Sequence, residues 1–92
     1  MFYFYVLESS KNKLYFGSTN DMRKRLTEHN SGKSYYTKGD KWTLIYYEAY
    51  RSEKDARIRE SRIKHHGQAK AQLKQRIATS RLPKVSAGQA GA

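Results

Sequence analysis

Near its start the chain carries two short runs dense in aromatic and aliphatic residues, at 2–7 and 13–18, separated by a polar cluster at 8–12. Runs of this length and composition are typical of strands, and the short polar link predicts an antiparallel hairpin. Side-chain alternation puts Tyr5 and Leu7 on the same face of the first strand. Because both faces are apolar, we expect the hairpin to be covered in part on each side.

A pattern with helical spacing follows the hairpin and covers residues 22–30. Asn20 or Asp21 can cap the start of this helix, and Gly32 ends it. A polar, basic loop then leads to residues 42–49, whose aromatic and aliphatic side chains predict a third strand.

Two further helices are predicted after the third strand. Ser52, followed three residues later by Asp55, makes a start similar to a capping box. The helix that begins there reaches about His66, and Gly67 separates it from a second, basic helix at 68–78.

The element order ββαβαα predicts an α+β fold, in which helices pack on a small three-stranded antiparallel sheet. We expect one domain over residues 1–79 and a disordered tail at 80–92, where a proline and a run of small residues occur. A chain of 92 residues buries a modest fraction of its surface, so a shallow, open site is easier to build than a deep pocket.

The charge of the chain changes the functional picture. A net charge of +11, from 19 Lys and Arg against 8 Asp and Glu, indicates a polyanionic partner. We expect nucleic acid in preference to an anionic membrane, since no predicted helix pairs a basic face with a broad apolar one. A basic protein without such a partner is the alternative that charge alone leaves open.

Several classes of protein are excluded or disfavoured by what the sequence lacks. Cysteine is absent, which excludes disulfides, thiolate metal sites and thiol redox catalysis. No apolar run approaches the roughly 20 residues that span a bilayer. The N-terminal segment lacks the charged start and cleavage site of a signal peptide, so we expect a cytoplasmic protein.

Glu60 breaks the apolar pattern of its predicted helix, because it lies in line with Ala56 and Ile63 on the face expected to meet the sheet. A carboxylate placed there needs either a cationic partner or a metal ion. The candidate cationic partners are Arg57, Lys64 and Arg25. The functional interpretation is an oxygen ligand for Mg²⁺, which proteins hold with one or two carboxylates, water and substrate phosphate.

Two phenols and two basic side chains precede this carboxylate. Tyr5 and Tyr15 lie on strands that we expect to pair, and Arg25 and His29 lie one helical turn apart. A phenol whose pKa is lowered by a neighbouring cation could accept a proton from water, and Arg is suited to contact phosphate. The alternative to a catalytic role is structural: the two tyrosines would pack in the sheet, and Arg25 and His29 would lie at the rim of an amphipathic helix.

The same residues resemble the motifs of the GIY-YIG nuclease family. In that family, one strand ends its motif in Tyr, the next strand begins its motif with Tyr, and an Arg, a His and a helical metal-binding Glu follow. The matching residues here are Tyr5, Tyr15 with Gly17, Arg25, His29 and Glu60. The resemblance covers residues 2 to about 77 and is especially close to small stand-alone members, which are similar to the N-terminal nuclease domain of the excision-repair protein UvrC.

The chain departs from the family pattern at a few positions. Tyr3 stands where the first motif has its Gly, and no Asn occurs after Asn30 to match one found late in many active members. Ser18 follows Gly17, where several active relatives carry a Lys that helps to activate the tyrosine.

The resemblance implies an endonuclease or nickase that hydrolyses phosphodiester bonds, with Mg²⁺ or Mn²⁺ as cofactor. Tyr5 would be the general base, positioned by Tyr15 and His29, while Arg25 would hold the scissile phosphate and Glu60 the metal ion. We expect DNA in preference to RNA, and selection of a DNA structure over a base sequence, since backbone contacts carry little sequence information. The oligomeric state is left open, a monomer included.

Basic and aromatic residues outside this set are the expected nucleic-acid contacts. They are Lys33, Tyr35, Tyr36, Lys38, Lys41, Arg59 and Lys70. Aromatic rings in a basic loop can stack bases, so the alternative function is a non-catalytic nucleic-acid-binding module of the same fold. Residues 51–92 carry 11 Lys and Arg against 3 acids, so the later helices should supply most phosphate contacts.

Overall fold

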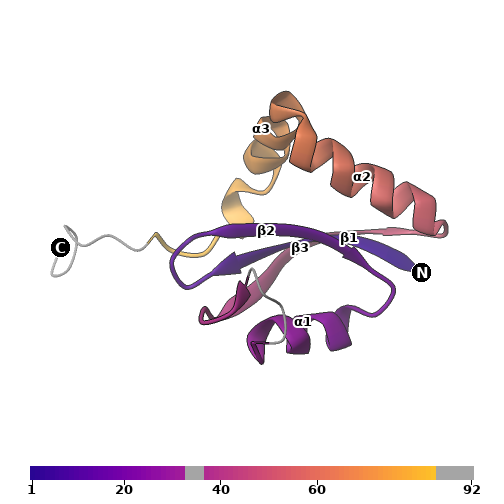
Figure 1. Ribbon diagram of the computed structural model, residues 1–92. Helices are drawn as coiled ribbons and strands as arrows, with labels where there is room; N and C mark the ends of the chain where they lie inside the picture. Colours follow the sequence, from indigo (N-terminus) through magenta and orange to yellow (C-terminus); the bar gives the residue numbers. More distant parts are fainter. Residues whose placement is uncertain (33–36, 85–92) are drawn as a thin grey trace, which may run out of the picture.

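Three antiparallel strands form one sheet in the order β2-β1-β3 (Figure 1). They are β1 (Phe2–Ser9), β2 (Leu14–Thr19) and β3 (Trp42–Tyr50). The structure is a computed structural model, and it describes residues 1–32 and 37–84. β1 takes the central position because its side chains are apolar on both faces, and residues 4–9 are buried.

The register of the sheet places Tyr5 and Tyr15 on a common face, because Leu7, on the same face as Tyr5, pairs with Tyr15. Tyr5 pairs with Gly17 of β2 and with Tyr47 of β3, so these three residues face the same side. Phe4 and Val6 face the other side. The β1–β3 pairing shifts by one residue between Val6 and Leu7, which is a β-bulge.

Helix α1 (Met22–Asn30) covers one face of the sheet, while α2 (Glu53–His65) and α3 (Gly67–Arg76) cover the other (Figure 1). The predicted caps are present, because the Asp21 side chain accepts a hydrogen bond from the Lys24 amide and Ser52 accepts one from the Asp55 amide. The predicted α+β fold and its element order are confirmed. No helix in the described ranges is long and apolar enough to cross a bilayer.

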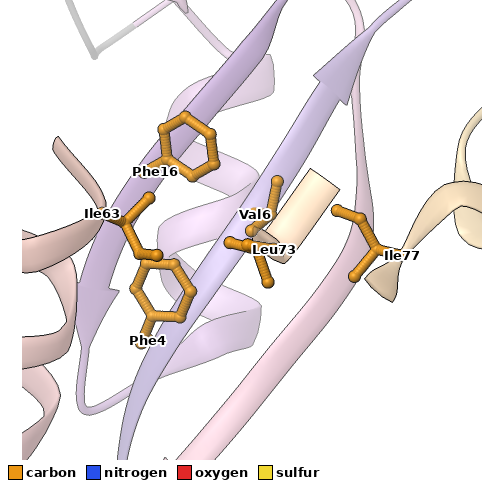
Figure 2. Close-up of a cluster of buried hydrophobic side chains, with 6 residues drawn as sticks. All are labelled: Phe4, Val6, Phe16, Ile63, Leu73 and Ile77. Atoms are coloured by element: carbon orange, nitrogen blue, oxygen red, sulfur yellow. The ribbon is translucent and has the colours of Figure 1, made fainter. Parts of the chain in front are cut away.

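The main hydrophobic core lies between the sheet and the two later helices. Ile63 of α2 packs against Phe4 and Phe16, and Leu73 of α3 lies beside Val6 (Figure 2). A second cluster on the α1 face joins Tyr5, Leu7 and Trp42 with partly buried residues of α1 and β2. The central strand is therefore covered on both sides, as its sequence predicts.

The chain after α3 returns to the β1–β2 hairpin. Glu8 is fully buried, and its carboxylate accepts hydrogen bonds from the Arg81 guanidinium and the Leu82 amide, each at 2.8 Å. Asn12, in the hairpin turn, donates to Glu8 and to the Pro83 carbonyl. Residues 81–83 thus contact the domain although they lie beyond the expected boundary at 79, and the rest of the expected tail, 85–92, lies outside the described residues.

Replacing Glu8 by Gln should lower the free energy of unfolding by about 2–3 kcal/mol, because Arg81 loses a buried, charged partner. Urea unfolding measures the loss. The control is Glu53→Gln, which removes the exposed partner of Arg57 and should cost less than about 1 kcal/mol. Equal losses in the two variants would show that the Glu8 contact does not hold residues 81–82 in place.

Candidate active site

The phenol of Tyr5 crosses directly over Gly17 on the neighbouring strand. A Cβ atom at position 17 would lie 2.5 Å from the Tyr5 hydroxyl oxygen and 2.6 Å from the ring carbon that carries it. Only glycine leaves room for this crossing. The crossing turns the Tyr5 hydroxyl toward β2, an edge strand of the sheet.

A chain of hydrogen bonds links Tyr5 to helix α1 and the following loop. The Tyr5 hydroxyl lies 2.8 Å from His29 Nε2, and His29 Nδ1 lies 2.9 Å from the Thr37 hydroxyl oxygen. The Thr37 hydroxyl donates to the His29 carbonyl at 3.4 Å, and on this basis we assign the ring proton of neutral His29 to Nδ1. Nε2 of the neutral ring is then the acceptor, and the Tyr5 hydroxyl donates to it.

Trp42 and Asn30 hold this chain in place. The Trp42 indole N–H donates to the Thr37 carbonyl at 2.8 Å. The Asn30 side chain accepts from the Trp42 amide at 2.7 Å and donates to the Trp42 carbonyl at 2.9 Å. The end of α1, the loop and the start of β3 are therefore joined around His29, which is fully buried.

Burial sets the protonation states of the central pair. It raises the pKa of Tyr5 to about 12, which outweighs the opposing hydrogen bond from Arg25. The expectation of a lowered phenol pKa is therefore wrong for Tyr5. Burial, aided by the positive charge of Arg25, also lowers the pKa of His29 to about 4. At neutral pH the pair consists of a neutral phenol and a neutral imidazole that can accept its proton.

Arg25 adds a fixed positive charge beside the phenol. Its Nε–H donates to the Tyr5 hydroxyl oxygen at 3.4 Å, and a second N–H donates to Glu28 at 3.1 Å. The hydrogen bond to Tyr5 and the contact with Glu28 keep the pKa of Arg25 above its ordinary value. A guanidinium has five N–H donors, so these contacts leave capacity for a phosphate oxygen.

The Tyr15 ring, on β2, contacts His29 of α1 and Lys64 of α2. Its ring centre lies 4.6 Å from that of His29, at an edge-to-face angle of 61°. The Lys64 ammonium, from α2, lies 5.7 Å from the centre of the same ring. Tyr15 is therefore in contact with residues from both helical layers.

Glu60 is a half-buried carboxylate at this edge, held by one hydroxyl and one ammonium. Ser18 donates to its Oε1 at 2.6 Å, and Lys64 donates to its Oε2 at 2.6 Å. Of the three cationic partners considered from the sequence, Lys64 is the one in contact. No group of three or more His, Asp or Glu side chains that could hold a metal ion occurs in the part of the chain that the structure describes.

The donor set fits a weakly held Mg²⁺ or Mn²⁺. A single, partly exposed carboxylate matches a hard cation that keeps most of its water and gains its other ligands from substrate phosphate. Glu60 is 24% exposed at its side chain, so its oxygens can be reached from solvent. The Lys64 ammonium already donates a hydrogen bond to one of those oxygens, Oε2.

The five predicted site residues come together around the outer edge of β2. Tyr5, Tyr15, Arg25 and His29 approach it from the α1 face, and Glu60 approaches from the α2 face. Sequence reasoning did not identify Thr37 or Ser18 as supports of His29 and Glu60. No pattern marks Thr37, which lies in a polar loop. Lys64 was predicted only as one of three possible cationic partners of Glu60, and not as a site residue.

The predicted nucleic-acid contacts differ in how far their side chains are available to a partner. Lys38 and Lys41 are exposed in the loop before β3. Arg59 instead points to Glu48 of β3, with its Nε 3.0 Å from a carboxylate oxygen, and lies over the Phe4 ring. Lys70 lies 5.6 Å from the centre of the Phe16 ring. Lys33, Tyr35 and Tyr36 lie outside the described residues.

Comparison with known proteins gives one matching family model, described as the GIY-YIG catalytic domain, over residues 1–77. A UPF0213 protein of Bacillus pumilus is 44% identical over 64 residues, which are 67% of this chain and 65% of that protein. The chain thus spans slightly less than two thirds of this relative's length. A UPF0213 protein of Haloquadratum walsbyi is 36% identical over 72 residues, 76% of this chain and 81% of that protein.

A solved structure shares the fold. The solution NMR structure of a UPF0213 protein from Bacillus halodurans matches with a TM-score of 0.53 and 28% identity. The match covers 92% of this chain and all of the other. The arrangement of sheet and helices is therefore shared with this UPF0213 structure.

Gly17→Ala should displace the Tyr5 phenol, because the added methyl group overlaps it, and should destabilise the fold by about 1–3 kcal/mol. Chemical denaturation measures the cost, and the nitrogen chemical shifts of the His29 ring report loss of its bond from Tyr5. Gly67→Ala is the control, since no atom lies within 4 Å of its added Cβ. If Gly17→Ala had the stability of the wild type and the same His29 nitrogen chemical shifts, Tyr5 would not pass over position 17 as described.

His29 should make the fold less stable as the pH falls from about 6.5 to about 4. In this window the unfolded chain binds a proton at His29 that the folded protein excludes, at a cost of up to about 3 kcal/mol. Glu8 and Glu48, whose pKa values are lowered, add losses only as the pH falls below about 4.5.

Urea unfolding at a series of pH values, with His29→Gln beside the wild type, isolates this contribution. The variant should be less stable than the wild type at pH 7 and should lose less stability between pH 6.5 and 4.5. Parallel curves for the two proteins in that window would show that His29 titrates normally in the folded state.

Proposed function

The chain belongs to the GIY-YIG catalytic domain family, and we propose that it is an endonuclease or nickase that hydrolyses DNA phosphodiester bonds with the help of one divalent metal ion. The observation that carries the proposal is the buried Tyr5–His29 pair, which meets Arg25 and Glu60 at one open sheet edge. A proton acceptor, a phosphate-binding cation and a metal-binding carboxylate are the groups that this hydrolysis needs.

Tyr5 and His29 would move the proton of the attacking water. The Tyr5 oxygen accepts a proton from water as its own hydroxyl proton passes to His29 Nε2, and the resulting hydroxide forms the new bond to phosphorus. Passing the proton onward avoids a buried phenolate, which the raised pKa of Tyr5 makes costly. The bond from phosphorus to the leaving oxygen would break as the bond to hydroxide forms, and the leaving oxygen would take a proton from solvent water. The imidazolium of His29 is acidic in this buried position, so it would return its proton to the Tyr5 oxygen, whose other proton passes to solvent.

Arg25 would bind the phosphate while it keeps Tyr5 in place. Its guanidinium already donates to the Tyr5 oxygen, so a phosphate oxygen bound to another of its N–H groups would lie close to that phenol. Charge that develops on the phosphoryl oxygens is then met by a cation that needs no reorientation. Glu28 fixes the other side of the guanidinium.

Glu60 would hold Mg²⁺ or Mn²⁺, with Ser18 orienting its carboxylate. When bound, such an ion polarises the phosphoryl group and stabilises the negative charge of the leaving oxygen. The single carboxylate supports weak binding that strengthens with substrate.

The DNA backbone would run over cations near the edge of β2 and the later helices. Lys38 and Lys41 are exposed and can contact phosphates. Arg59 is a weaker candidate than the sequence suggests, because Glu48 neutralises its charge. We expect selection of a DNA structure over a base sequence, because contacts of this kind read the backbone.

A non-catalytic nucleic-acid-binding module of the same fold is the second candidate. The raised pKa of Tyr5 and the occupation of Glu60 by Lys64 favour it, since both work against turnover. A module of this kind would bind DNA with equal affinity in Mg²⁺ and in chelator, and would leave it intact.

Incubation with supercoiled plasmid separates the two candidates. We expect nicking in Mg²⁺ or Mn²⁺ and none in EDTA, and a loss of about 100-fold or more in Glu60→Gln and in Arg25→Ala. Both variants should still bind DNA. Glu53→Gln, which removes a carboxylate from the exposed first turn of the same helix, is the matched control and should nick normally. Metal-independent nicking, or full activity of Glu60→Gln, would refute the proposed endonuclease.

A further inference from the structure

Lys64 occupies a position that an ordinary surface ion pair does not explain. Its ammonium lies 2.6 Å from Glu60 Oε2 and 5.7 Å from the centre of the Tyr15 ring. It thus touches both the carboxylate proposed to bind metal and a tyrosine of the site. Arg57 and Glu53 form a pair of the same helical spacing two turns earlier, at 3.2 Å, but that pair lies in solvent with more than half of each side chain exposed.

A groove begins where Lys64 lies. It has a volume of about 480 Å³ and runs along the outer edge of β2. Its lining residues are Lys13, Leu14, Tyr15, Phe16, Trp42 and Lys64. Two lysines therefore border a largely apolar floor, and the exposed Lys13 side chain also pairs with Asp40 at 3.4 Å. This lining suits a nucleic-acid strand whose sugars and bases rest on the floor and whose phosphates meet the lysines.

The geometry points to Lys64 as an exchangeable cation, which pairs with Glu60 while the site holds no substrate and turns to a backbone phosphate when nucleic acid enters this groove. The inference rests on the proposed function, because it concerns the Glu60 metal site of that nuclease. Lysine is suited to this exchange, since its compact charge sits on a flexible four-carbon stem. Half-exposed pairs of this kind are individually weak, so little opposes the change of partner.

The exchange would couple two binding events. With Lys64 on Glu60, a divalent cation must displace an ammonium before it reaches the carboxylate. A phosphate in the groove gives Lys64 another partner, and so raises the affinity of Glu60 for the metal ion. By thermodynamic linkage, the metal ion raises the affinity for nucleic acid by the same factor. The protein would thus acquire its cofactor together with its substrate.

Lys64→Met tests the exchange, because it keeps an unbranched side chain of similar size and removes the charge. The affinity for Mn²⁺ is measured from the free-ion electron paramagnetic resonance signal, with and without a short single-stranded DNA oligonucleotide. We expect the oligonucleotide to raise Mn²⁺ affinity about fivefold or more in the wild type. In Lys64→Met the affinity without oligonucleotide should rise about fivefold, and the oligonucleotide should have little further effect.

Two further variants separate the exchange from simpler electrostatics. Arg57→Met removes the same charge from the same helix and should behave as the wild type, and Lys64→Arg should retain most of the coupling. Suppose that Glu60→Gln lowers the Mn²⁺ affinity but that the oligonucleotide raises the affinity of Lys64→Met as much as that of the wild type. This result would overturn the exchange, while the proposed nuclease would remain supported. Mn²⁺ affinity that Glu60→Gln does not change would overturn both, because the metal ion would then bind elsewhere.

Discussion

The architecture of the site depends on one close crossing, that of an aromatic ring over a residue without a side chain. Because Tyr5 passes over Gly17, a hydroxyl that originates on the central strand is delivered to the edge of the sheet. His29 can then be buried against it, and Thr37 and Trp42 can close over the imidazole. A side chain at position 17 would move the Tyr5 hydroxyl away from its acceptor, His29 Nε2. The contacts of Thr37 and Trp42 around His29 would then lose the hydrogen bond that links them to the sheet.

The two helical layers contribute different physical properties to the same edge. The α1 layer supplies a buried, neutral hydrogen-bonded chain in which burial sets the protonation states. The α2 layer supplies charged groups that remain partly in water and can change partners. Proton transfer benefits from a fixed, dry environment, whereas binding of ions and phosphates requires access to solvent. A thin sheet with an open edge allows both environments within contact distance of Tyr15.

Much of this arrangement follows from the sequence, and the reasons for the exceptions are physical. Strands and helices were predictable because apolar periodicity, caps and glycines agree along the chain, and the Arg25–His29 spacing fixes their common helix face. The direction of the Tyr5 pKa was not predictable, because it is the balance of burial and Arg25 at distances that only tertiary structure sets. Thr37 and Ser18 carry no periodic signal, since each acts through a single contact. The contact of Arg59 with Glu48 was not predictable, because the pairing of a helix residue with a residue of β3 is set by tertiary structure.

The buried carboxylate of Glu8 has a consequence for how the molecule is made. Glu8 lies in the first strand to be synthesised, whereas the Leu82 amide that it binds comes 74 residues later. Until that segment has been added, the carboxylate must keep its water, and this end of the central strand stays hydrated. Closure of the hairpin end is therefore a late event with a large sequence separation, of the kind that slows folding. A chain that lacks residues 81–83 can form the sheet but leaves the Glu8 carboxylate, at this end of the central strand, in contact with water.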